Sequence, residues 1–432
     1  MNLNRRHFLI IGFVNFAAIQ LLCFSQTKYQ NIEIPIKNYG YPYNGCEPSI
    51  AINPNNKNHI AAGSILDLYH FSKDAGKTWK TKRLKSSFGV YGDPVLLFNN
   101  LDEVFYFHLS DYKKTSHLDR IVCQKSKCIN GKFNEGSYTK PNGKKVQDKH
   151  WIINNPANQN LYMTWTQFDA YNSKNKKDSS YIMFSKSTDR GNSWSLPKVV
   201  SKFGGDCLDS DNTVEGAVPA IGKNGVIVVV WTGPSGLMMQ RSIDEGETWL
   251  ESEKKIMEHP GGWDIEIPGF YRANGLPFLV SDMSNTESEG TLYLNWADQR
   301  NGDNDTDIWL ITSNDNGESW TPPMRVNQDT TKTHQFFTNM CVDPVNGNLH
   351  FIFYDRSRIN KDSFSTEVCW VSSADGGKSF SSEIISDHHF ISNPSIFFGD
   401  YLDIDAFDGM IRPIWPSFEN NKIKLWTALI DM

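Results

Sequence analysis

The sequence predicts an all-β protein built as a closed ring of four-stranded sheets, and three observations point to it. A turn motif of the form S-x-D-x-G-x-[ST]-[WF] occurs five times, at 72–79, 187–194, 242–249, 313–320 and 373–380. Short β-rich runs bounded by Gly, Asn or Asp separate these turns. Beyond the N-terminal leader no stretch shows a long helical period. A recurring motif of this kind is typical of a repeat architecture, here a single β-propeller.

The turn motif is built from residues that close a tight turn. In the copy at 242–249, Asp244 and Thr248 can accept hydrogen bonds from nearby backbone N–H groups. Gly246 supplies the positive φ that such turns need. Trp249 ends the motif and places an apolar ring under the hairpin. We therefore expect the motif to be a structural staple and not a catalytic element.

The spacing of the motifs predicts the number of sheets, or blades. The motif aspartates lie at positions 74, 189, 244, 315 and 375, and the first gap is about twice the others. Residues 126–133 fit a decayed copy in that gap, with Cys128 in place of the aspartate. Six units follow, and after the last one lie strands expected at 399–407, 410–418 and 422–430. A strand at 29–37 can complete this last blade and close the ring, which gives seven blades; six is the alternative.

Composition and the N-terminus bear on location and partners. The net charge is −6 and no basic cluster occurs, which argues against nucleic acid or an anionic membrane as partner. Residues 1–25 resemble a cleaved signal peptide, with Arg5 and Arg6 before a short apolar run. We expect an exported protein, periplasmic or secreted, with the propeller at 26–432 and no membrane span after signal removal. A lipid anchor at Cys23 is an alternative to full release.

Cysteine usage leaves two alternatives open. Removing the leader leaves six cysteines, namely Cys46, Cys123, Cys128, Cys207, Cys341 and Cys369. An even number in an exported protein permits disulfides, and Cys123 with Cys128 is the nearest pair along the chain. Buried free thiols are the other interpretation.

Candidate site residues follow from the geometry of a propeller, in which first-strand starts and the loops after second strands meet at one mouth of the ring. The catalytic candidates are His150, Tyr401, Glu215 and Asp93, and the substrate-binding candidates are Arg300, Arg356, Lys149 and Asp148. Two arginines in matching places can grip a carboxylate with bidentate hydrogen bonds. Histidine can act as a base near neutral pH. These residue types together favour chemistry on an acidic oligosaccharide or polysaccharide.

No cofactor is expected, except that one further loop could bind a metal ion. Asp303, Asp305 and Asp307 alternate within 301–307. Alternating carboxylates in a loop can hold Ca²⁺, and a solvated hairpin is the competing interpretation.

The repeated turn resembles the Asp box of the BNR-repeat, sialidase-like β-propeller family, and the resemblance covers about residues 40–432. By position, it implies Arg300 and Arg356 as carboxylate-binding arginines, Tyr401 with Glu215 as a nucleophile pair and Asp93 as acid/base. The chain departs from the sialidase pattern in two respects. The Phe/Tyr-Arg-Ile-Pro motif is absent from 43–50, and seven blades are expected instead of six.

Three functions compete at this point. The first is an exported enzyme that cleaves a C–O bond at a uronate-type sugar by elimination, as lyase or dehydratase. In that case the arginine pair would bind the carboxylate, and His150 and Tyr401 would move protons. The second is a sialidase-type exo-glycoside hydrolase. The third is a non-catalytic propeller that binds glycan or protein, because fold does not imply function.

Overall fold

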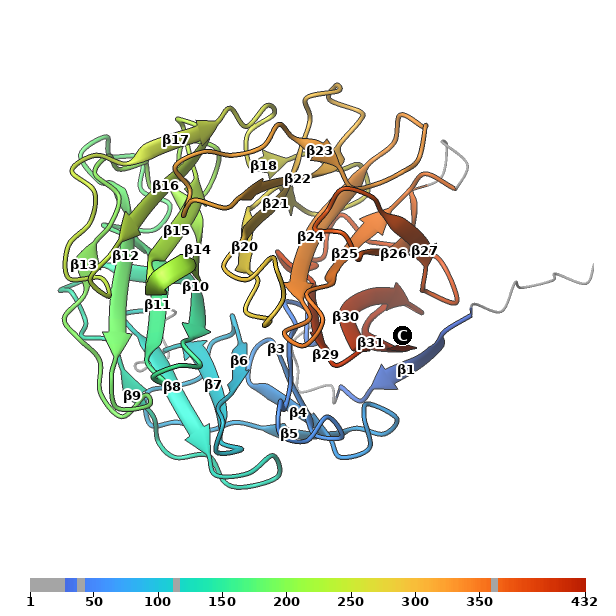
Figure 1. Cartoon of the computed structure of the whole chain (residues 1–432), viewed down its shortest axis with the longest axis horizontal. Helices are drawn as coiled ribbons and strands as arrows, with labels where there is room; N and C mark the ends of the chain where they lie inside the picture. Colours follow the sequence, from blue (N-terminus) through green and yellow to red (C-terminus); the bar gives the residue numbers. More distant parts are fainter. Residues whose placement is uncertain (1–27, 37–42, 112–116, 359–363) are drawn as a thin grey trace, which may run out of the picture.

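A computed structural model of the chain describes residues 28–36, 43–111, 117–358 and 364–432. In this part of the chain seven sheets surround a central axis, and their strands are connected in sequence order (Figure 1). The predicted seven-bladed β-propeller is confirmed. The leader at 1–25, with Cys23, lies outside the described residues. Within those residues, no helix has the length and apolar character needed to cross a membrane.

Each blade is a four-stranded antiparallel meander with its first strand nearest the axis. Blade 1 comprises β2 (Ser49–Ile52), β3 (Ile60–Ser64), β4 (Leu68–Ser72) and β5 (Lys80–Arg83). Blade 2 comprises β6 (Val95–Phe98), β7 (Val104–Leu109), β8 (Ile121–Ser126) and β9 (Ser137–Tyr138). Blade 3 comprises β10 (Val146–Asn154), β11 (Leu161–Phe168), β12 (Ser180–Ser187) and β13 (Lys198–Val199). Blades 4 and 5 comprise β14 (Glu215–Ile221), β15 (Ile227–Thr232), β16 (Leu237–Ser242) and β17 (Lys254–Met257); and β20 (Phe278–Ser281), β21 (Leu292–Asp298), β22 (Asp307–Ser313) and β23 (Met324–Arg325).

Blade 6 carries an extra strand and a further hairpin stands between blades 4 and 5. Blade 6 comprises β24 (Gln335–Val342), β25 (Leu349–Asp355), β26 (Ser365–Ser373) and β27 (Ser381–Ile384), and β28 (Phe390–Ile391) also pairs with β26. The hairpin consists of β18 (Asp264–Ile265) and β19 (Ala273–Asn274). A short 3₁₀ turn, η1 (Lys223–Gly225), links β14 to β15.

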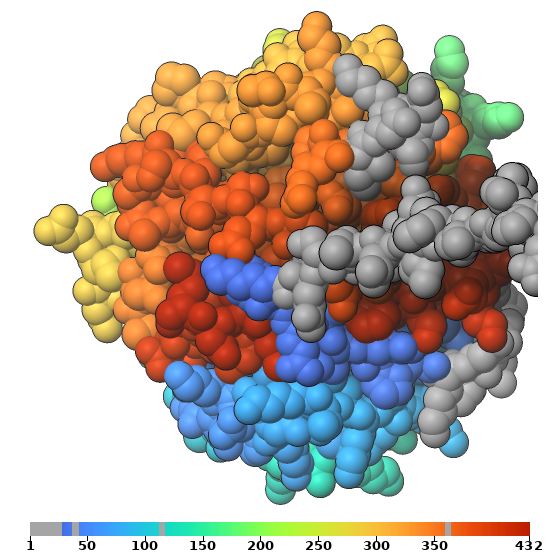
Figure 2. Space-filling model, turned by 90° about the vertical axis from the view of Figure 1, so that its right-hand side faces the viewer, coloured from blue at the N-terminus to red at the C-terminus, as the bar shows by residue number. Residues whose placement is uncertain are grey.

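The two ends of the described chain share blade 7 and close the ring. This blade comprises β29 (Asp403–Phe407), β30 (Met410–Glu419), β31 (Lys422–Asp431) and, as outermost strand, β1 (Gln30–Ile34). β1 pairs antiparallel with β31, and Figure 2 shows this blue N-terminal segment against the red C-terminal blade. The predicted closure by the N-terminal strand is confirmed. It joins the two ends of the described sequence by main-chain hydrogen bonds, so it removes a seam that would otherwise expose strand edges.

The repeated turns lie where the sequence places them, between third and fourth strands. In the copy after β16, the Ser242 hydroxyl donates to Asp244 at 2.7 Å and accepts from Gly246 N–H at 2.8 Å. Asp244 accepts from the backbone N–H and the hydroxyl of Thr248 at 2.8 and 2.6 Å. The glycine is required twice over, because its φ is +81° and a Cβ there would lie 2.2 Å from the Phe184 ring.

The decayed copy keeps the turn but not its carboxylate. After β8, the Ser126 hydroxyl donates to the main-chain carbonyl of Cys128 at 2.8 Å, and the Gly131 N–H donates to the same carbonyl at 2.9 Å. The Ser126 hydroxyl therefore donates to a main-chain carbonyl in place of the carboxylate, whereas the Gly131 bond has a counterpart in intact copies such as Glu247 N–H to the Asp244 carbonyl. Within the described residues the six cysteines are free, and all except Cys128 are buried. The interpretation as buried thiols thus holds for five of them, and the Cys123–Cys128 disulfide is not formed.

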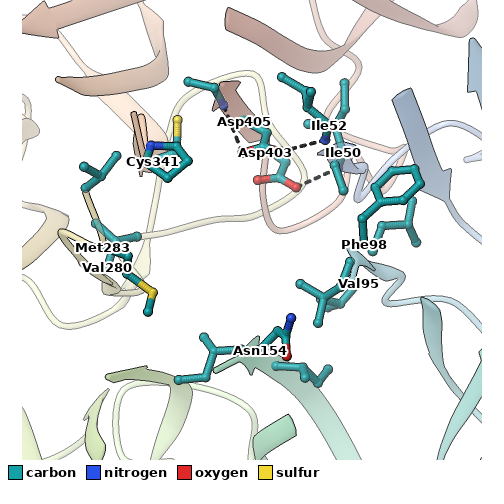
Figure 3. A pocket seen from close by; sticks show the side chains of 18 of the residues that line it. Ile50, Ile52, Val95, Phe98, Asn154, Val280, Met283, Cys341, Asp403 and Asp405 are labelled. Atoms are coloured by element: carbon teal, nitrogen blue, oxygen red, sulfur yellow. Dashed lines mark hydrogen bonds between the residues drawn. The ribbon is translucent and has the colours of Figure 1, made fainter. Parts of the chain in front are cut away.

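The core consists of apolar clusters between neighbouring blades. Second strands contribute the largest fully buried rings, Trp165, Trp231, Trp296 and Trp415. On the axis, a cavity of about 400 Å³ is lined mainly by apolar side chains of first strands (Figure 3). Two of its polar groups close the ring, since Asp403 accepts from Ile50 N–H and Asp405 from Ile52 N–H, both at 2.7 Å. The axial channel itself therefore offers little chemistry.

Candidate functional site

The first strands of several blades begin with an unusual backbone that redirects their side chains. Glu47, Asp93, Lys149 and Phe337 have φ values of 48°, 50°, 45° and 53°. Non-glycine residues rarely adopt this left-handed region, and each costs about 1–3 kcal/mol. In β10 the ladder also has a bulge between Asp148 and Trp151. Bulges re-aim side chains, and charged groups from several blades consequently meet at one mouth.

These groups line a cavity of about 480 Å³ at that mouth. Its charged lining residues are Glu47, Asp93, Asp148, Lys149, Arg272 and Asp400, and its aromatic ones are Tyr43, Tyr91, Tyr171, Tyr271 and Phe397. Each blade is antiparallel, so the start of a first strand and the turn after a third strand lie at opposite ends. The repeated turns therefore face away from the cavity.

Lys149 is at the centre of the charged cluster. Its ammonium lies 2.9 Å from Asp400, and the two side chains are only 5% and 3% exposed. Burial opposes the charge, but Asp400 and Glu215 outweigh this effect and hold the pKa of Lys149 well above its ordinary value. Its main-chain N–H donates to both Asp148 at 2.9 Å and Asp93 at 3.3 Å. One N–H thus joins two carboxyl groups from neighbouring blades.

Asp93 and Asp148 form a pair of carboxyl groups that accept from the same N–H. Burial is the largest cause that raises the pKa of Asp148, to about 8, and the neighbouring Asp93 carboxylate raises it further. Burial is also the largest cause that raises the pKa of Asp93, although the charge of Lys149 acts against it. Two like charges this close cannot both ionise easily. At neutral pH Asp148 therefore holds a proton, which it can share with Asp93.

Arg272 reaches the cavity from the β18–β19 hairpin. Its Nε donates to Asp400 Oδ1 at 2.7 Å, its Nη2 donates to Asp400 Oδ2, and its Nη1 donates to Asp209 Oδ2 at 2.8 Å. These bonds use three of the five N–H groups of the guanidinium. The side chain remains 27% exposed and stacks on Phe397 at 5.3 Å. Arg272 can therefore receive an anionic group of a ligand while it stays paired with the protein.

The remaining carboxyl groups divide into two protonation classes. Burial works against ionisation of Asp400, yet Arg272 and Lys149 lower its pKa. The same two cations lower the pKa of Asp209, which also accepts from the Tyr171 hydroxyl at 2.6 Å. Burial raises the pKa of Glu47 and of Glu215 well above the ordinary value. Asp400 and Asp209 are thus ionised beside the two cations, whereas Glu47 and Glu215 can hold protons.

Tyr401 and His150 lie beneath or outside the cavity. Tyr401 is 8% exposed and its ring packs against Trp151 at 5.4 Å. Burial, and then Asp93 and Glu47, raise its pKa well above the ordinary value. His150 is buried beside His108, and burial lowers its pKa to about 3. Neither side chain is among the residues that line the cavity.

Arg300 and Arg356 also lie away from the cavity. Arg300 donates to Asp298 at 2.9 and 2.6 Å and lies 4.3 Å from the Trp309 ring. Arg356 donates to the Pro268 carbonyl at 2.8 Å and to Thr366 at 3.1 Å. The structure thus brings together Asp93, Asp148, Lys149 and Glu215, whereas His150, Arg300 and Arg356 are dispersed.

Several cavity residues are not among the candidates from the sequence. Glu47 and Asp400 lie next to first-strand starts and Arg272 lies in a long insert, so these positions were the available signal. Asp209 and the four cavity tyrosines carried no signal in the sequence, because each lies in an irregular connection. Their positions depend on contacts between segments far apart in the chain, such as the bond from Asn274 to the Asp400 carbonyl at 2.8 Å.

The aspartates at 303–307 do not form a calcium site. Asp307 is engaged by Asn327 at 2.7 Å and by Asn301 at 2.6 Å. Asp305 is buried, whereas Asp303 is exposed. Within the described ranges, no group of three or more His, Cys, Asp or Glu side chains is arranged to hold a metal ion.

Comparison with known proteins defines the architecture. Neither a protein-family model nor a curated protein sequence matches the chain. An ulvan lyase of a polysaccharide lyase family, bound to -[GlcA(1-4)Rha3S]-, matches with a TM-score of 0.51 at 12% identity over 93% of this chain and 96% of its own. NanB sialidase from Streptococcus pneumoniae matches with a TM-score of 0.50 at 11% identity over 87% and 83%.

These likenesses establish the fold class. The chain is a seven-bladed β-propeller, and its structural neighbours include carbohydrate-active propeller enzymes. At 11–12% identity the similarity extends to the fold alone. The chemistry must be argued from the residues of the cavity.

Proposed function

We propose that this protein is a carbohydrate-active enzyme that cleaves a C–O bond of a uronate-type sugar by elimination, as a lyase or dehydratase. The observation that supports the proposal is the Asp93–Asp148 pair, two carboxyl groups that line one cavity and accept from the same N–H of Lys149, and whose pKa values burial raises. Elimination on one face of a sugar needs a base for the α-proton and an acid for the leaving oxygen. An adjacent carboxylate and carboxylic acid provide both.

The steps conserve protons and electrons. Arg272 binds the sugar carboxylate with its two remaining N–H groups and so acidifies the adjacent C–H. Asp93 takes that proton, and the C–H electron pair forms the new C=C bond as the C–O bond breaks. The leaving oxygen receives its proton from Asp148. Transfer of the proton from Asp93 to Asp148 restores the starting state.

The arrangement of the carboxyl groups differs from that of an inverting glycoside hydrolase. Glycoside hydrolases place their two carboxyl groups about 5–5.5 Å apart when they retain configuration and about 6.5–9.5 Å apart when they invert it. The accepting oxygens of Asp93 and Asp148 lie 3.3 and 2.9 Å from one N–H, so they are too close for an inverting pair. A sialidase-type mechanism would also need Tyr401 as nucleophile, and this side chain is buried against Trp151.

Lys149 holds Asp93 and Asp148 in place. Its N–H orients both carboxyl groups, and its ammonium with Arg272 keeps Asp400 ionised. Aromatic side chains such as Tyr43, Tyr171 and Phe397 provide faces on which sugar rings can pack. The site thus combines a proton-transfer pair, a carboxylate-binding arginine and apolar walls.

A panel of glycans tests the proposal. We expect ultraviolet absorbance of an unsaturated uronate to rise with a polyuronate or a rhamnose–glucuronate polysaccharide. Asp93→Asn and Asp148→Asn should each lower kcat by about 10²–10⁴-fold, the usual contribution of a general acid or base. Release of sugar from a fluorogenic sialoside without unsaturated product would establish hydrolysis instead. Binding without turnover by the folded protein would identify a non-catalytic propeller.

A further inference from the structure

The connection between β17 and β20 carries Arg272 and covers part of the cavity mouth. It spans residues 258–277 and contains the β18–β19 hairpin, whose two-residue strands pair Asp264 with Asn274 and Ile265 with Ala273. So short a hairpin is marginal on its own. The loop at 266–272 within it therefore needs contacts from the ring to keep Arg272 in place.

Those contacts come from blades 6 and 7. Phe270 is 7% exposed and packs against Phe336 at 4.9 Å and Phe398 at 5.2 Å. The Ser392 hydroxyl donates to the Gly269 carbonyl. The loop thus packs against an aromatic cluster that includes Phe336 and Phe398.

Arg356 provides a polar contact that holds the loop in this position. Its Nη1 donates to the Pro268 carbonyl at 2.8 Å, and its Nε donates to Thr366 at 3.1 Å. The guanidinium lies 5.4 Å from the ring centres of both Phe270 and Phe336. One side chain therefore binds the main chain of the loop and packs on its aromatic residue.

Arg356 is an expensive residue to bury. It is 6% exposed, and no carboxylate of the described residues lies within ion-pair distance of it. Burial alone lowers its pKa to about 10. A buried cation without an ionic partner is costly. Contacts with Pro268 and Phe270 of the loop offset part of that cost, so the side chain is placed to hold the loop.

We propose that Arg356 is a positioning residue, which fixes the loop at 266–272 and through it keeps Arg272 at the substrate. The path is short, since Arg356 binds Pro268 and Phe270, and Arg272 follows two residues later and contacts Asp400 and Asp209. The inference rests on the proposed function, because Arg272 is the group that binds the sugar carboxylate there. In this role Arg356 does not contact the substrate and acts only through Arg272.

Two variants and a matched control test the inference. Arg356→Lys keeps a charged donor for the Pro268 carbonyl, whereas Arg356→Met removes every donor. Arg412→Met is the control, because Arg412 is also buried and donates to main-chain carbonyls of Ala75 and Ile430. It lies at the blade 7–blade 1 seam, away from the loop. The Arg412→Met variant should be less stable than the wild type, but the residues that line its cavity should keep their positions.

We expect amide hydrogen exchange at 266–272 to accelerate at least about tenfold in Arg356→Met, less in Arg356→Lys and not in Arg412→Met. The KM for a uronate substrate should rise in the same order, and kcat/KM should fall on the order of tenfold to a hundredfold in Arg356→Met, because small misplacements of binding groups are costly. Unchanged exchange, or unchanged kcat/KM with faster exchange, would overturn the inference. If neither the wild type nor any variant eliminates a uronate, the proposed function is wrong. The hydrogen-exchange experiment then decides by itself whether Arg356 holds the loop.

Discussion

Replacing Lys149 by methionine should destabilise the protein, and more strongly at high pH than at low pH. The substitution keeps the length of the side chain and the main-chain N–H that joins Asp93 and Asp148. It removes the ammonium that lies 2.9 Å from Asp400 in a contact where both side chains are nearly fully buried. The change therefore tests the charge of Lys149 and not its packing.

The expected magnitude follows from the remaining partners. Breaking a buried ion pair costs about 3–5 kcal/mol, because a buried charge is left without its partner. Arg272 still binds Asp400 through Nε and Nη2, so we expect the lower end, about 3 kcal/mol at pH 8. For a domain of about 400 residues, with an unfolding entropy of about 2.1 cal/mol/K per residue, that corresponds to a fall in Tm of roughly 3–4 °C.

The sign of the pH dependence follows from the carboxyl groups. The pKa of Lys149 is raised, so its charge and its contribution are complete throughout the range from pH 5 to 8. Lys149 lowers the pKa of Asp148, Glu215 and Asp400 in the folded protein. Without it these pKa values rise, and a carboxyl group with a folded pKa above its unfolded value destabilises the fold as the pH rises. At pH 5 protons replace the missing charge, and the loss should fall below about 2 kcal/mol.

Thermal unfolding of wild type and variant at pH 5 and pH 8 measures this difference. Lys145→Met is a suitable control, because Lys145 pairs with Asp169 at 2.8 Å at the surface, where the two side chains are 35% and 27% exposed. Its Tm should change by less than about 2 °C, as for other exposed pairs. An equal loss for Lys149→Met at both pH values would refute the assignment of Lys149 as the counter-charge of the carboxyl cluster.

Three further predictions concern the acid, the displaced arginine and the repeated turn. Elimination by the wild type should slow above pH 8, where Asp148 (pKa about 8) loses its proton, and Asp148→Asn should remove this limb of the pH–rate profile. Arg300→Met should leave KM unchanged in steady-state kinetics, because Arg300 pairs with Asp298 outside the cavity. Asp244→Ala should lower the free energy of unfolding in urea titrations by about 2 kcal/mol, since it removes the bonds to Thr248.

The architecture could be predicted because the propeller is a local repeat. Each motif serine ends a third strand, as at Ser72, Ser187 and Ser242, so the motif positions mark the blades directly. The strand that closes the ring could be inferred from the missing fourth strand of the last blade. Cysteine pairing could not be inferred, because it depends on which side chains face each other across a sheet. Cys123, for example, is buried and Cys128 is exposed.

The site could be predicted in outline but not in its assignments. First-strand starts correctly pointed to Asp93, Asp148 and Lys149 as residues at one mouth. His150 follows Lys149 directly, yet the backbone turn at Lys149 (φ 45°) and the bulge in β10 direct its ring into the protein. No spacing rule in the sequence reveals that bulge. Protonation states depend on burial and on charges from other blades, which the sequence alone does not place.

Arg300 and Arg356 show how matching sequence positions acquire different roles. Both follow the second strand of a blade, and both guanidinium groups lie over aromatic rings. Arg300 has a carboxylate, Asp298, within its own blade and needs no other partner. Arg356 instead faces the insert between blades 4 and 5, and its shorter hydrogen bond, at 2.8 Å, goes to a carbonyl of that insert. The insert also brings Arg272 to the mouth, so the arginine at the cavity comes from a connection and not from the repeat. A propeller can therefore change its chemistry by lengthening one connection while the repeating framework stays the same.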